Sequence, residues 1–353
     1  MVAAGIYDIN DTIREEKDYI PKESIWIKDA AATFLPHENK LTCRSGKTYP
    51  YDVLVVCPGI QIDWQKIKGL KETLGKNEVS SNYSVEHAPY TWQMIKNLKG
   101  GTAVFTNPGT PIKCGGAPHK IMYLACDYWH KKGILNKIDV HYISGGGVIF
   151  GIKEYAETLN KTIKKYNIKT HFKSEVVEID GIRKKLLFET KNADGIIDRT
   201  EMKFDICHAV APQSAPDFIK TSPLAEAQNP YGYVEVDKHT LQHSRFENIF
   251  SLGDSMNAPC SKTGAAIRKQ APVVVKNVLA FLKNEPITAK YQGYSACPIP
   301  TQYGKLMLAE FDYSNEPTMT FPFDQSKPRW TMWILKTKIL PWLYWNKILK
   351  GTA

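Results

Sequence analysis

The sequence predicts an α/β protein, because short apolar runs typical of strands alternate with amphipathic patterns typical of helices. The clearest part of this pattern has two strands, at residues 102–106 (TAVFT) and 138–144 (IDVHYIS). A predicted helix follows each strand, at 118–131 and 153–166, and Pro at the start of the first one favours helix initiation there. This order indicates the parallel sheet of a doubly wound, nucleotide-domain architecture.

The rest of the chain continues the alternation. The apolar run 52–57 (DVLVVC), closed by Pro58-Gly59, predicts a buried strand that stops at a turn. A long helical pattern covers 263–283, and Pro272 is expected to kink it. The other expected elements are a hairpin of strands at 25–34 and 40–49, a helix at 86–98, and strands at 168–179 and 246–252.

The composition is that of a globular protein with excess positive charge. The 353 residues are 43% apolar and 23% charged, which suggests two or three domains and argues against wholesale disorder. The net charge of +10 attracts anions such as phosphorylated cofactors, acidic lipid or nucleic acid. No run of about 18 uncharged apolar residues is present, so a membrane-spanning helix is not expected.

Cys114 is the first candidate for redox chemistry. The chain has seven cysteines and no C-x-x-C pair, which argues against a disulfide framework and against a metal site of the zinc-ribbon type. Cys114 lies in the loop 107–118 (NPGTPIKCGGAP), where the start of the next helix, with Lys113 and Lys120, favours its thiolate. Cys126, on the apolar face of that helix, fits an inert core cysteine.

Neither Gly-rich loop matches a nicotinamide-nucleotide fingerprint. The pattern G-x-G-x-x-G is missing from 107–118. The cluster 144–151 (SGGGVIFG) follows the second strand without the acidic residue that would hold a ribose, and we interpret it as a tight turn. Together, the two loops indicate a nucleotide-domain architecture in which NAD(P)H binding has been lost.

Two later segments carry further candidates. Gly253-Asp254 ends a predicted strand, as in flavoproteins where such a carboxylate binds the ribityl hydroxyls of FAD. The next helix would point its positive end at the flavin, strengthened by Lys262. Cys297 lies among turn residues in GYSACP, so we expect it outside the core and able to meet Cys114 only through the fold.

The C-terminal stretch 329–351 (RWTMWILKTKILPWLYWNKILKG) predicts an interfacial membrane anchor. Pro341 should break it into two short helices, and Lys336 and Lys338 make it too charged to span a bilayer. The alternative is a pair of helices packed on the core or on a partner subunit. The residues expected at the membrane are Trp330, Trp333, Trp342 and Trp345.

Two weaker patterns stay open. His119 follows the Cys114 loop and is either an acid–base group or a structural histidine. Lys161, Lys164, Lys165 and Lys169 are interpreted as a solvated face rather than a nucleic-acid patch, because no aromatic side chains are interleaved with them.

Several stretches resemble mitochondrial-type sulfide:quinone oxidoreductases. The resemblance runs from about residue 22 to the C-terminus, and both cysteine-bearing segments occur in the family's order. It implies two Rossmann-like dinucleotide-binding domains of the type found in FAD- and NAD(P)-linked disulfide reductases, peripheral on the inner mitochondrial membrane. The segments are 48–70 (TYPYDVLVVCPGIQIDWQKIKGL), 81–92 (SNYSVEHAPYTW), 106–124 (TNPGTPIKCGGAPHKIMYL), 252–266 (LGDSMNAPCSKTGAA), 291–313 (YQGYSACPIPTQYGKLMLAEFDY) and 321–330 (FPFDQSKPRW).

The resemblance also implies an activity and a set of site residues. Family members oxidise sulfide, pass two electrons through FAD to ubiquinone, and give a sulfane sulfur to a small acceptor such as glutathione, sulfite or coenzyme A. Cys114 resembles the cysteine beside the flavin and Cys297 the partner that carries the persulfide; hydrosulfide opens the oxidised sulfur bridge between them. The implied FAD-binding residues are Pro58, Gly59, Ile60, Gln61, Gly253, Asp254, Lys262 and Thr263, and the quinone entrance is assigned to Tyr303, Phe321, Phe323 and the Trp-rich tail.

The sequence departs from the family at its start. The strand and G-x-G-x-x-G that bind the ADP half of FAD are not found in MVAAGIYDIN, and no import signal is visible, so we expect an incomplete first domain. The expected regions are a partial FAD-binding domain (1–99), a second Rossmann-like domain (100–235), a return to the FAD-binding domain (236–290) and a C-terminal quinone and membrane region (291–353). The alternatives are a truncated non-catalytic membrane-associated homologue and an NADH-fed quinone reductase.

Overall fold

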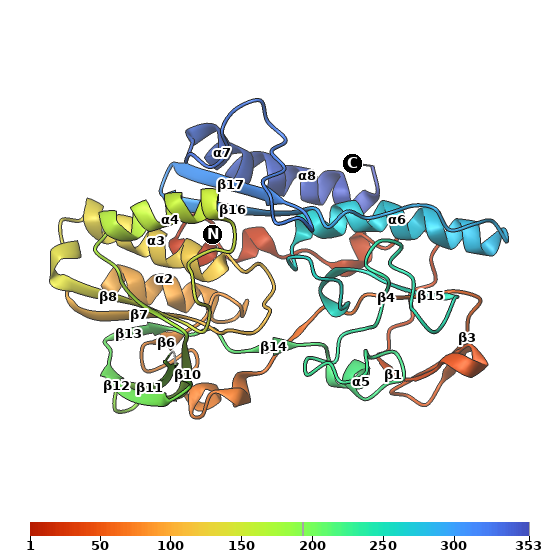
Figure 1. Cartoon of the computed structure of the whole chain (residues 1–353), viewed down its shortest axis with the longest axis horizontal. Helices are drawn as coiled ribbons and strands as arrows, with labels where there is room; N and C mark the ends of the chain where they lie inside the picture. The colour runs from red at the N-terminus through yellow and green to blue at the C-terminus, as the bar shows by residue number, and fades with distance from the viewer. Residues whose placement is uncertain (193, 353) are drawn as a thin grey trace.

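The computed structural model describes residues 1–192 and 194–352. Its largest sheet has five strands, all parallel, in the order β6-β13-β7-β8-β9 (Figure 1). The strands are β6 (Val79–Ser80), β13 (Ile206–His208), β7 (Gly101–Asn107), β8 (Ile138–Ser144) and β9 (Lys169–Phe172). This sheet confirms the predicted parallel α/β architecture.

The parallel sheet is covered on both faces. Phe105 and Tyr142 pack toward the helices α2 (Ala88–Asn97), α3 (Ala117–Lys131) and α4 (Lys153–Lys165). The alternate residues Val104 and Ile143 pack instead with the antiparallel sheet β10-β11-β12 on the other side. Double coverage explains why these strands read as continuous apolar runs. The covering strands are β10 (Ser174–Asp180), β11 (Lys185–Lys191) and β12 (Ile197–Lys203).

The predicted strand 168–179 is two strands in two different sheets. Lys173 separates β9 from β10 and has φ 54°, a left-handed conformation that redirects the chain from the parallel sheet into the antiparallel one. A lysine rarely marks such a turn, so the local sequence gave no sign of the break.

A second region is built around β4 (Leu54–Val56) and β15 (Ile249–Ser251), which pair in parallel. The helix α6 (Gly264–Leu282) follows β15 and continues past Pro272. The pair β5 (Gln61–Ile62) and β14 (Gln213–Ser214) lies between the two regions (Figure 1). The proposed division into four chain regions stays a prediction.

The expected N-terminal hairpin is shorter than predicted and has a third strand. Its antiparallel strands are β1 (Ala31–Leu35), β2 (Lys40–Cys43) and β3 (Thr48–Pro50). Residues 25–30 lie outside it, and Ile25 is 91% exposed, so its apolar side chain has no sheet to join. The remaining short helices are α1 (Leu70–Thr73) and α5 (Asp217–Lys220). Short 3-10 turns cover Val2–Ala4, Asn10–Thr12, Glu16–Asp18, Pro36–Glu38, Trp64–Lys66, Leu135–Lys137, Gly253–Ser255 and Ile348–Lys350.

The C-terminal part consists of a hairpin and two short helices. The hairpin is β16 (Ser295–Gln302) and β17 (Lys305–Phe311), and the helices are α7 (Trp330–Ile334) and α8 (Leu340–Asn346). A π-helical segment, Leu335–Ile339, joins the helices, and Pro341 lies in the first turn of α8. The wider π turn accommodates the proline ring without the predicted break. Among the described residues, no helix has both the length and the apolar character needed to span a membrane.

Glu310 holds the segment before α7 onto the hairpin. Glu310 is only 3% exposed. Its carboxylate accepts hydrogen bonds from Thr320 N (3.0 Å), Thr320 Oγ1 (2.8 Å), Gln325 Nε2 (2.5 Å) and the Tyr294 hydroxyl. A buried carboxylate with several donors stabilises only while all partners are present.

We therefore expect Glu310→Ala to lower the free energy of unfolding by about 3 kcal/mol, because it leaves buried donors unpaired. Chemical denaturation of the variant and of Glu316→Ala, which removes an exposed carboxylate nearby, measures the difference. Equal stability of the two variants would contradict the assigned role.

Candidate functional site

Cys114 is held in an unusual backbone conformation in the loop between β7 and α3. It has φ 53°, in the left-handed region, although it is not glycine. Its N–H donates to the carbonyl of Lys262 (2.7 Å), and its own carbonyl accepts from Ala117 N (2.7 Å) at the start of α3. Tyr83 adds a hydrogen bond from its hydroxyl to the Lys113 carbonyl (3.0 Å). These contacts fix the loop between the parallel sheet and the segment before α6.

Cys297 lies in strand β16 and is 1% exposed, so the expectation that it lies outside the core is wrong. It pairs with Ala309 of β17 and packs in the same apolar cluster as α3. The neighbouring Pro298 and Pro300 resemble turn residues in sequence, but in this two-stranded hairpin both take part in the strand.

The fold brings the two sulfurs together. The hydrogen bond from Cys297 is the main reason that the pKa of Cys114 lies well below its usual value, and Lys120, with Nζ 2.9 Å from the Cys114 sulfur, adds to it. The same hydrogen bond, with burial, holds the pKa of Cys297 well above its usual value. Both cysteines are free thiols. These opposite shifts make Cys114 the more acidic thiol of the pair.

Two lysines give the sulfur pair a positive environment. Burial lowers the pKa of Lys120, but the negative charge on the two sulfurs outweighs burial and raises this pKa above its usual value. Burial, and then repulsion from Lys120, lowers the pKa of Lys336, which comes from the π-helical segment and also acts on Cys114. In the sequence, Lys336 served only as an argument against a membrane span, and no local pattern distinguishes it from its exposed neighbour Lys338.

The other cysteines lack this activation. Burial raises the pKa of Cys126, and raises that of Cys207 to about 12. Burial also raises the pKa of Cys260, which is half-buried. Of the described cysteines with a shifted pKa, Cys114 alone has it lowered, as expected for a reactive thiol.

Asp254 is a half-buried carboxylate without a protein partner among the described residues. Burial raises the pKa of this carboxylate. Gly253, with φ 77°, precedes it and donates its N–H to Gln270 Oε1 (2.9 Å). Pro58-Gly59 leaves β4 at the same end as Gly253 leaves β15, and a Cβ added to Gly59 would meet no atom within 4 Å. This is the crevice at the carboxyl ends of parallel strands where cofactors bind.

The start of α6 adds a positive end to this crevice. Thr263 caps the helix by accepting from Ala266 N (3.2 Å), and Lys262 Nζ donates to the Met256 carbonyl (2.9 Å). Burial lowers the pKa of Lys262 to about 8. Lys262 also lies over the ring of Tyr233 (3.8 Å), whose buried hydroxyl has no partner among the described residues. The free carboxylate, orphaned hydroxyl and helix end fit the ribityl and pyrimidine parts of a flavin.

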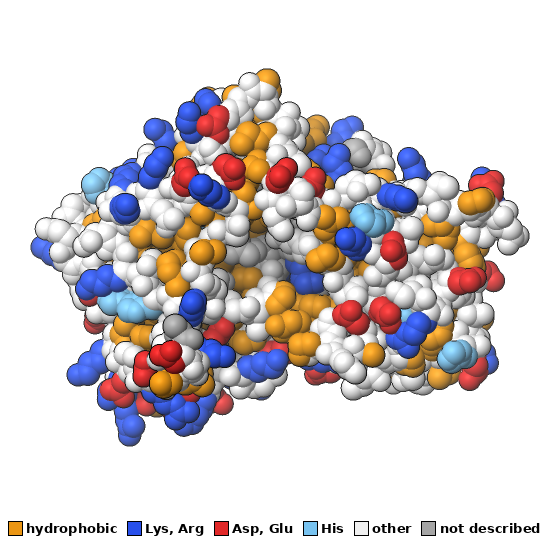
Figure 2. All heavy atoms as spheres, in the orientation of Figure 1, with side chains coloured by type: hydrophobic (Ala, Val, Ile, Leu, Met, Phe, Trp, Pro, Cys, Tyr) orange, Lys and Arg blue, Asp and Glu red, His pale blue; other side chains and the backbone are white. Residues whose placement is uncertain are grey.

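Not every predicted cofactor residue is available. The Gln61 amide donates to Asp63 (2.8 Å) and Asp217 (2.9 Å) and accepts from the Asp217 N–H (3.0 Å). The side chain of Gln61 thus fixes the β5 segment, while Ile60 is half-buried in the second core cluster. Figure 2 shows a hollow at the centre of this face, between the region of the parallel sheet and the region of β4 and β15.

The predicted quinone and membrane residues fall into two sets. Trp330 and Trp342 are 63% and 55% exposed. Tyr303 lies against Trp333, with ring centroids 6.1 Å apart, and Phe321 stacks on Phe323 at 5.4 Å. Trp345 instead packs on Tyr19 (5.4 Å) and under Arg14. The C-terminal helices therefore bury part of their aromatic face and present the rest to the surroundings.

His119 is buried inside the fold. It is 3% exposed, its Nε2 pairs with the Tyr142 hydroxyl (2.8 Å), and burial lowers its pKa to about 3. The burial and the tyrosine partner favour the structural interpretation of this histidine over the acid–base one.

A carboxylate fills the place where a nicotinamide nucleotide would bring its phosphates. Glu175 accepts from Gly109 N (2.6 Å), and a Cβ added to Gly145 would lie 1.9 Å from the same carboxylate oxygen. The two Gly-rich loops therefore enclose an internal anion. This geometry supports the interpretation that the architecture does not take up NAD(P)H.

The fold and the thiol pair define an oxidoreductase of the two-dinucleotide-domain, disulfide-reductase-like class. The crystal structure of the sulfide:quinone oxidoreductase from Aquifex aeolicus superimposes with a TM-score of 0.81 at 19% identity, over 100% of this chain and 82% of that chain. A search of protein-family models gives no match.

Sequence relatives specify the family. The chain is 44% identical to the mitochondrial sulfide:quinone oxidoreductase of Dictyostelium discoideum, over 99% of this chain and 76% of the relative. It is 39% identical to the mitochondrial enzyme of that name from Mus musculus, over 99% of this chain and 77% of the relative. The chain belongs to the sulfide:quinone oxidoreductase family, as its cysteine-bearing segments predicted.

The position of Lys120 generates a test of the thiol pair. We expect Lys120→Met to raise the pKa of Cys114 by about one to three units, because the thiolate loses its nearest positive charge. The ultraviolet absorbance of the thiolate, followed against pH, reports the shift. Lys132→Met, at the exposed end of α3, serves as the control and should leave the titration unchanged.

Proposed function

We propose that this chain oxidises sulfide, passes two electrons through FAD to a quinone, and transfers a sulfane sulfur to a small acceptor. The observation that carries the proposal is the position of Lys120 Nζ, 2.9 Å from the sulfur of Cys114, a thiol whose interaction with Cys297 shifts the pKa values of the two cysteines in opposite directions. Membership in the sulfide:quinone oxidoreductase family supports it. The acceptor is a nucleophile of the type of glutathione, sulfite or coenzyme A.

The proposed cycle begins with the two sulfurs joined in an oxidised bridge. Hydrosulfide attacks the Cys297 sulfur and breaks the bridge, which forms a Cys297 persulfide and releases Cys114 as a thiolate. The acceptor then removes the outer sulfur and leaves a Cys297 thiol. Re-forming the bridge releases one proton and two electrons, so each cycle oxidises one sulfide sulfur.

The chain's own residues favour each of these steps. Lys120 stabilises the Cys114 thiolate as it leaves, and the low pKa of that thiol makes it the better leaving group. Lys120 and Lys336 together attract a small anion to the sulfur pair. The burial of Cys297 limits the access of water to its persulfide.

The residues of the crevice would hold the flavin. When bound, FAD accepts the two electrons from the thiol pair and delivers them to the quinone. Asp254 would bind the ribityl hydroxyls, and the α6 end capped by Thr263 would face the pyrimidine side. Pro58-Gly59 would lie along the ring system.

Membrane contact through the C-terminal helices completes the proposal. Exposed Trp330 and Trp342 beside lysines suit the membrane–water interface. Tyr303, Phe321 and Phe323 would line the entrance for ubiquinone. The relatives from Dictyostelium and mouse are named mitochondrial enzymes, and we place this chain on the inner mitochondrial membrane as a peripheral protein.

The thiol pair is tested by removing one sulfur at a time. We expect Cys297→Ala and Cys114→Ser each to reduce sulfide-dependent reduction of a soluble quinone, with added FAD, by at least about a hundredfold. Cys43→Ala, a buried cysteine of β2, should retain activity. Full turnover by Cys297→Ala, or none by the parent chain, would count against the proposal.

The flavin crevice is tested through Asp254. We expect Asp254→Asn to weaken FAD binding roughly tenfold, because the neutral amide loses charge-assisted hydrogen bonds to the ribityl chain. Quenching of flavin fluorescence during titration of the purified chain measures the affinity. Asp198→Asn, on the exposed strand β12, is the matched control. Unchanged affinity in Asp254→Asn would remove this residue from the site.

The two alternatives make different predictions. An NADH-fed quinone reductase would oxidise NADH, which the Glu175 carboxylate between the Gly-rich loops disfavours. A non-catalytic membrane-associated homologue would purify colourless and bind no added flavin. The flavin spectrum and an NADH oxidation assay therefore separate both alternatives from the proposed enzyme.

A further inference from the structure

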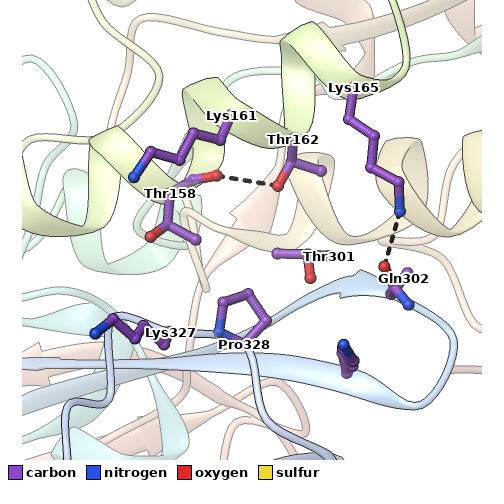
Figure 3. Close-up of a pocket in the computed structure, with 9 residues that line it drawn as sticks. Thr158, Lys161, Thr162, Lys165, Thr301, Gln302, Lys327 and Pro328 are labelled. Carbon is purple, nitrogen blue, oxygen red and sulfur yellow. Dashed lines mark hydrogen bonds between the residues drawn. The ribbon is translucent and has the colours of Figure 1, made fainter.

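A pocket lined by four lysines lies between α4 and the β16–β17 hairpin (Figure 3). Its volume is about 310 Å³, and its cationic residues are Lys161, Lys165, Lys305 and Lys327. Thr301 and Gln302, at the far end of β16 from Cys297, form part of its wall. Thr301 lies four residue steps along the strand from Cys297, or roughly 13 Å, so this pocket is distinct from the sulfur site.

The charges in the pocket are poorly compensated. No carboxylate is among the side chains that line it. Lys327 pairs with Asp324 (3.2 Å), and Lys165 Nζ donates to the neutral Gln302 (2.8 Å). Lys161 and Lys305 have no acidic partner within the described residues. Since Lys161 and Lys165 are one helical turn apart, their like charges repel, and a bound anion would relieve that repulsion.

The walls of the pocket are tied together. Thr158 of α4 donates its hydroxyl to the Ser326 carbonyl (2.8 Å), and Arg329 N donates to the Leu306 carbonyl (2.9 Å). The hydroxyl of Thr301, a residue 5% exposed, has no hydrogen-bond partner within the described part of the chain. The pocket therefore combines a fixed shape, a free hydroxyl donor and two uncompensated ammonium groups. From sequence alone, Lys161 and Lys165 belong to a predicted solvated face.

The position of the pocket favours one source of anion. Lys327-Pro328, at its rim, stand directly before α7, where Trp330 is 63% exposed. Met332 of α7 packs on Leu306 and Leu308 of β17. In Figure 1, α4, α7 and α8 lie along the same upper side of the molecule. Aromatic side chains at a membrane interface would thus bring the lysines to the level of the lipid headgroups.

We propose that this pocket binds the phosphate of an acidic phospholipid headgroup, and this inference rests on the membrane contact proposed above for the C-terminal helices. Lys161 and Lys305 supply charge, and Thr301 supplies a neutral donor. A phosphodiester carries the negative charge that the pocket lacks, and its volume accommodates the phosphate with its glycerol.

The test is binding of the full chain to vesicles of phosphatidylcholine alone, and of phosphatidylcholine mixed with phosphatidylglycerol, followed by co-sedimentation. We expect the parent chain to favour the acidic vesicles, and the double variant Lys161→Gln/Lys305→Gln to lose roughly tenfold of that affinity. Lys164→Gln/Lys276→Gln removes the same charge from α4 and α6 outside the pocket and should retain the preference. Thermal melting of each variant checks folding.

The outcomes separate the pocket from the membrane contact. Equal losses in the two double variants, or no preference for acidic vesicles in a parent that binds both kinds, would overturn the pocket alone. A parent that binds neither kind would overturn the membrane contact as well, and Trp330→Ser/Trp342→Ser should weaken binding to both kinds if that contact exists. Binding of free glycerol phosphate, seen by phosphorus NMR and lost in Lys161→Gln/Lys305→Gln without a vesicle preference, would replace the lipid with a soluble ester.

Discussion

The contact between Cys114 and Cys297 is the constraint around which the rest of the molecule is arranged. Cys114 depends on the end of β7 and on the Lys262 carbonyl, while Cys297 depends on the β16–β17 hairpin and its packing on α3. Each sulfur is thus held by different elements, and small shifts of any of them would change the distance between the sulfurs. The separation of the two thiols is therefore set by the tertiary fold and not by local chain geometry.

The same architecture explains why the loop after β7 carries Cys114 and is not arranged to hold the phosphates of a nicotinamide nucleotide. In a doubly wound domain that binds a dinucleotide, the loop after the first strand of the unit holds phosphate through its backbone N–H groups. Here that loop directs Cys114 toward the hairpin, and Glu175 accepts one of its N–H groups. The positive potential at the start of the helix that follows β7 is present here too. The negative groups beside it belong to the protein itself: the Cys114 thiolate on one side and the Glu175 carboxylate on the other.

The sequence predicted local elements well where periodicity and packing agree. The strands β7 and β8 and the helices α3 and α4 fall within one residue of their predicted bounds, because buried parallel strands and amphipathic helices have strong, distinct patterns. Cys297 was misjudged because Ser, Pro and Gly around it resemble a turn, and only pairing with β17 makes the segment a strand. The role of Lys336 depends on how the π-helical segment packs on the sulfur site, and no local pattern encodes such a tertiary contact.

The excess positive charge at the two sulfurs favours negatively charged sulfur species there. Two half-buried lysines act on the Cys114 sulfur, and the pKa of Lys336 is lowered first by burial and then by repulsion from Lys120. A second anion beside the two sulfurs would reduce the repulsion between Lys120 and Lys336, and this gain would tighten the binding of that anion. Hydrosulfide is small and anionic, so the environment that stabilises the Cys114 thiolate also favours entry of the nucleophile that creates it. Leaving group and attacking group are therefore served by the same two side chains.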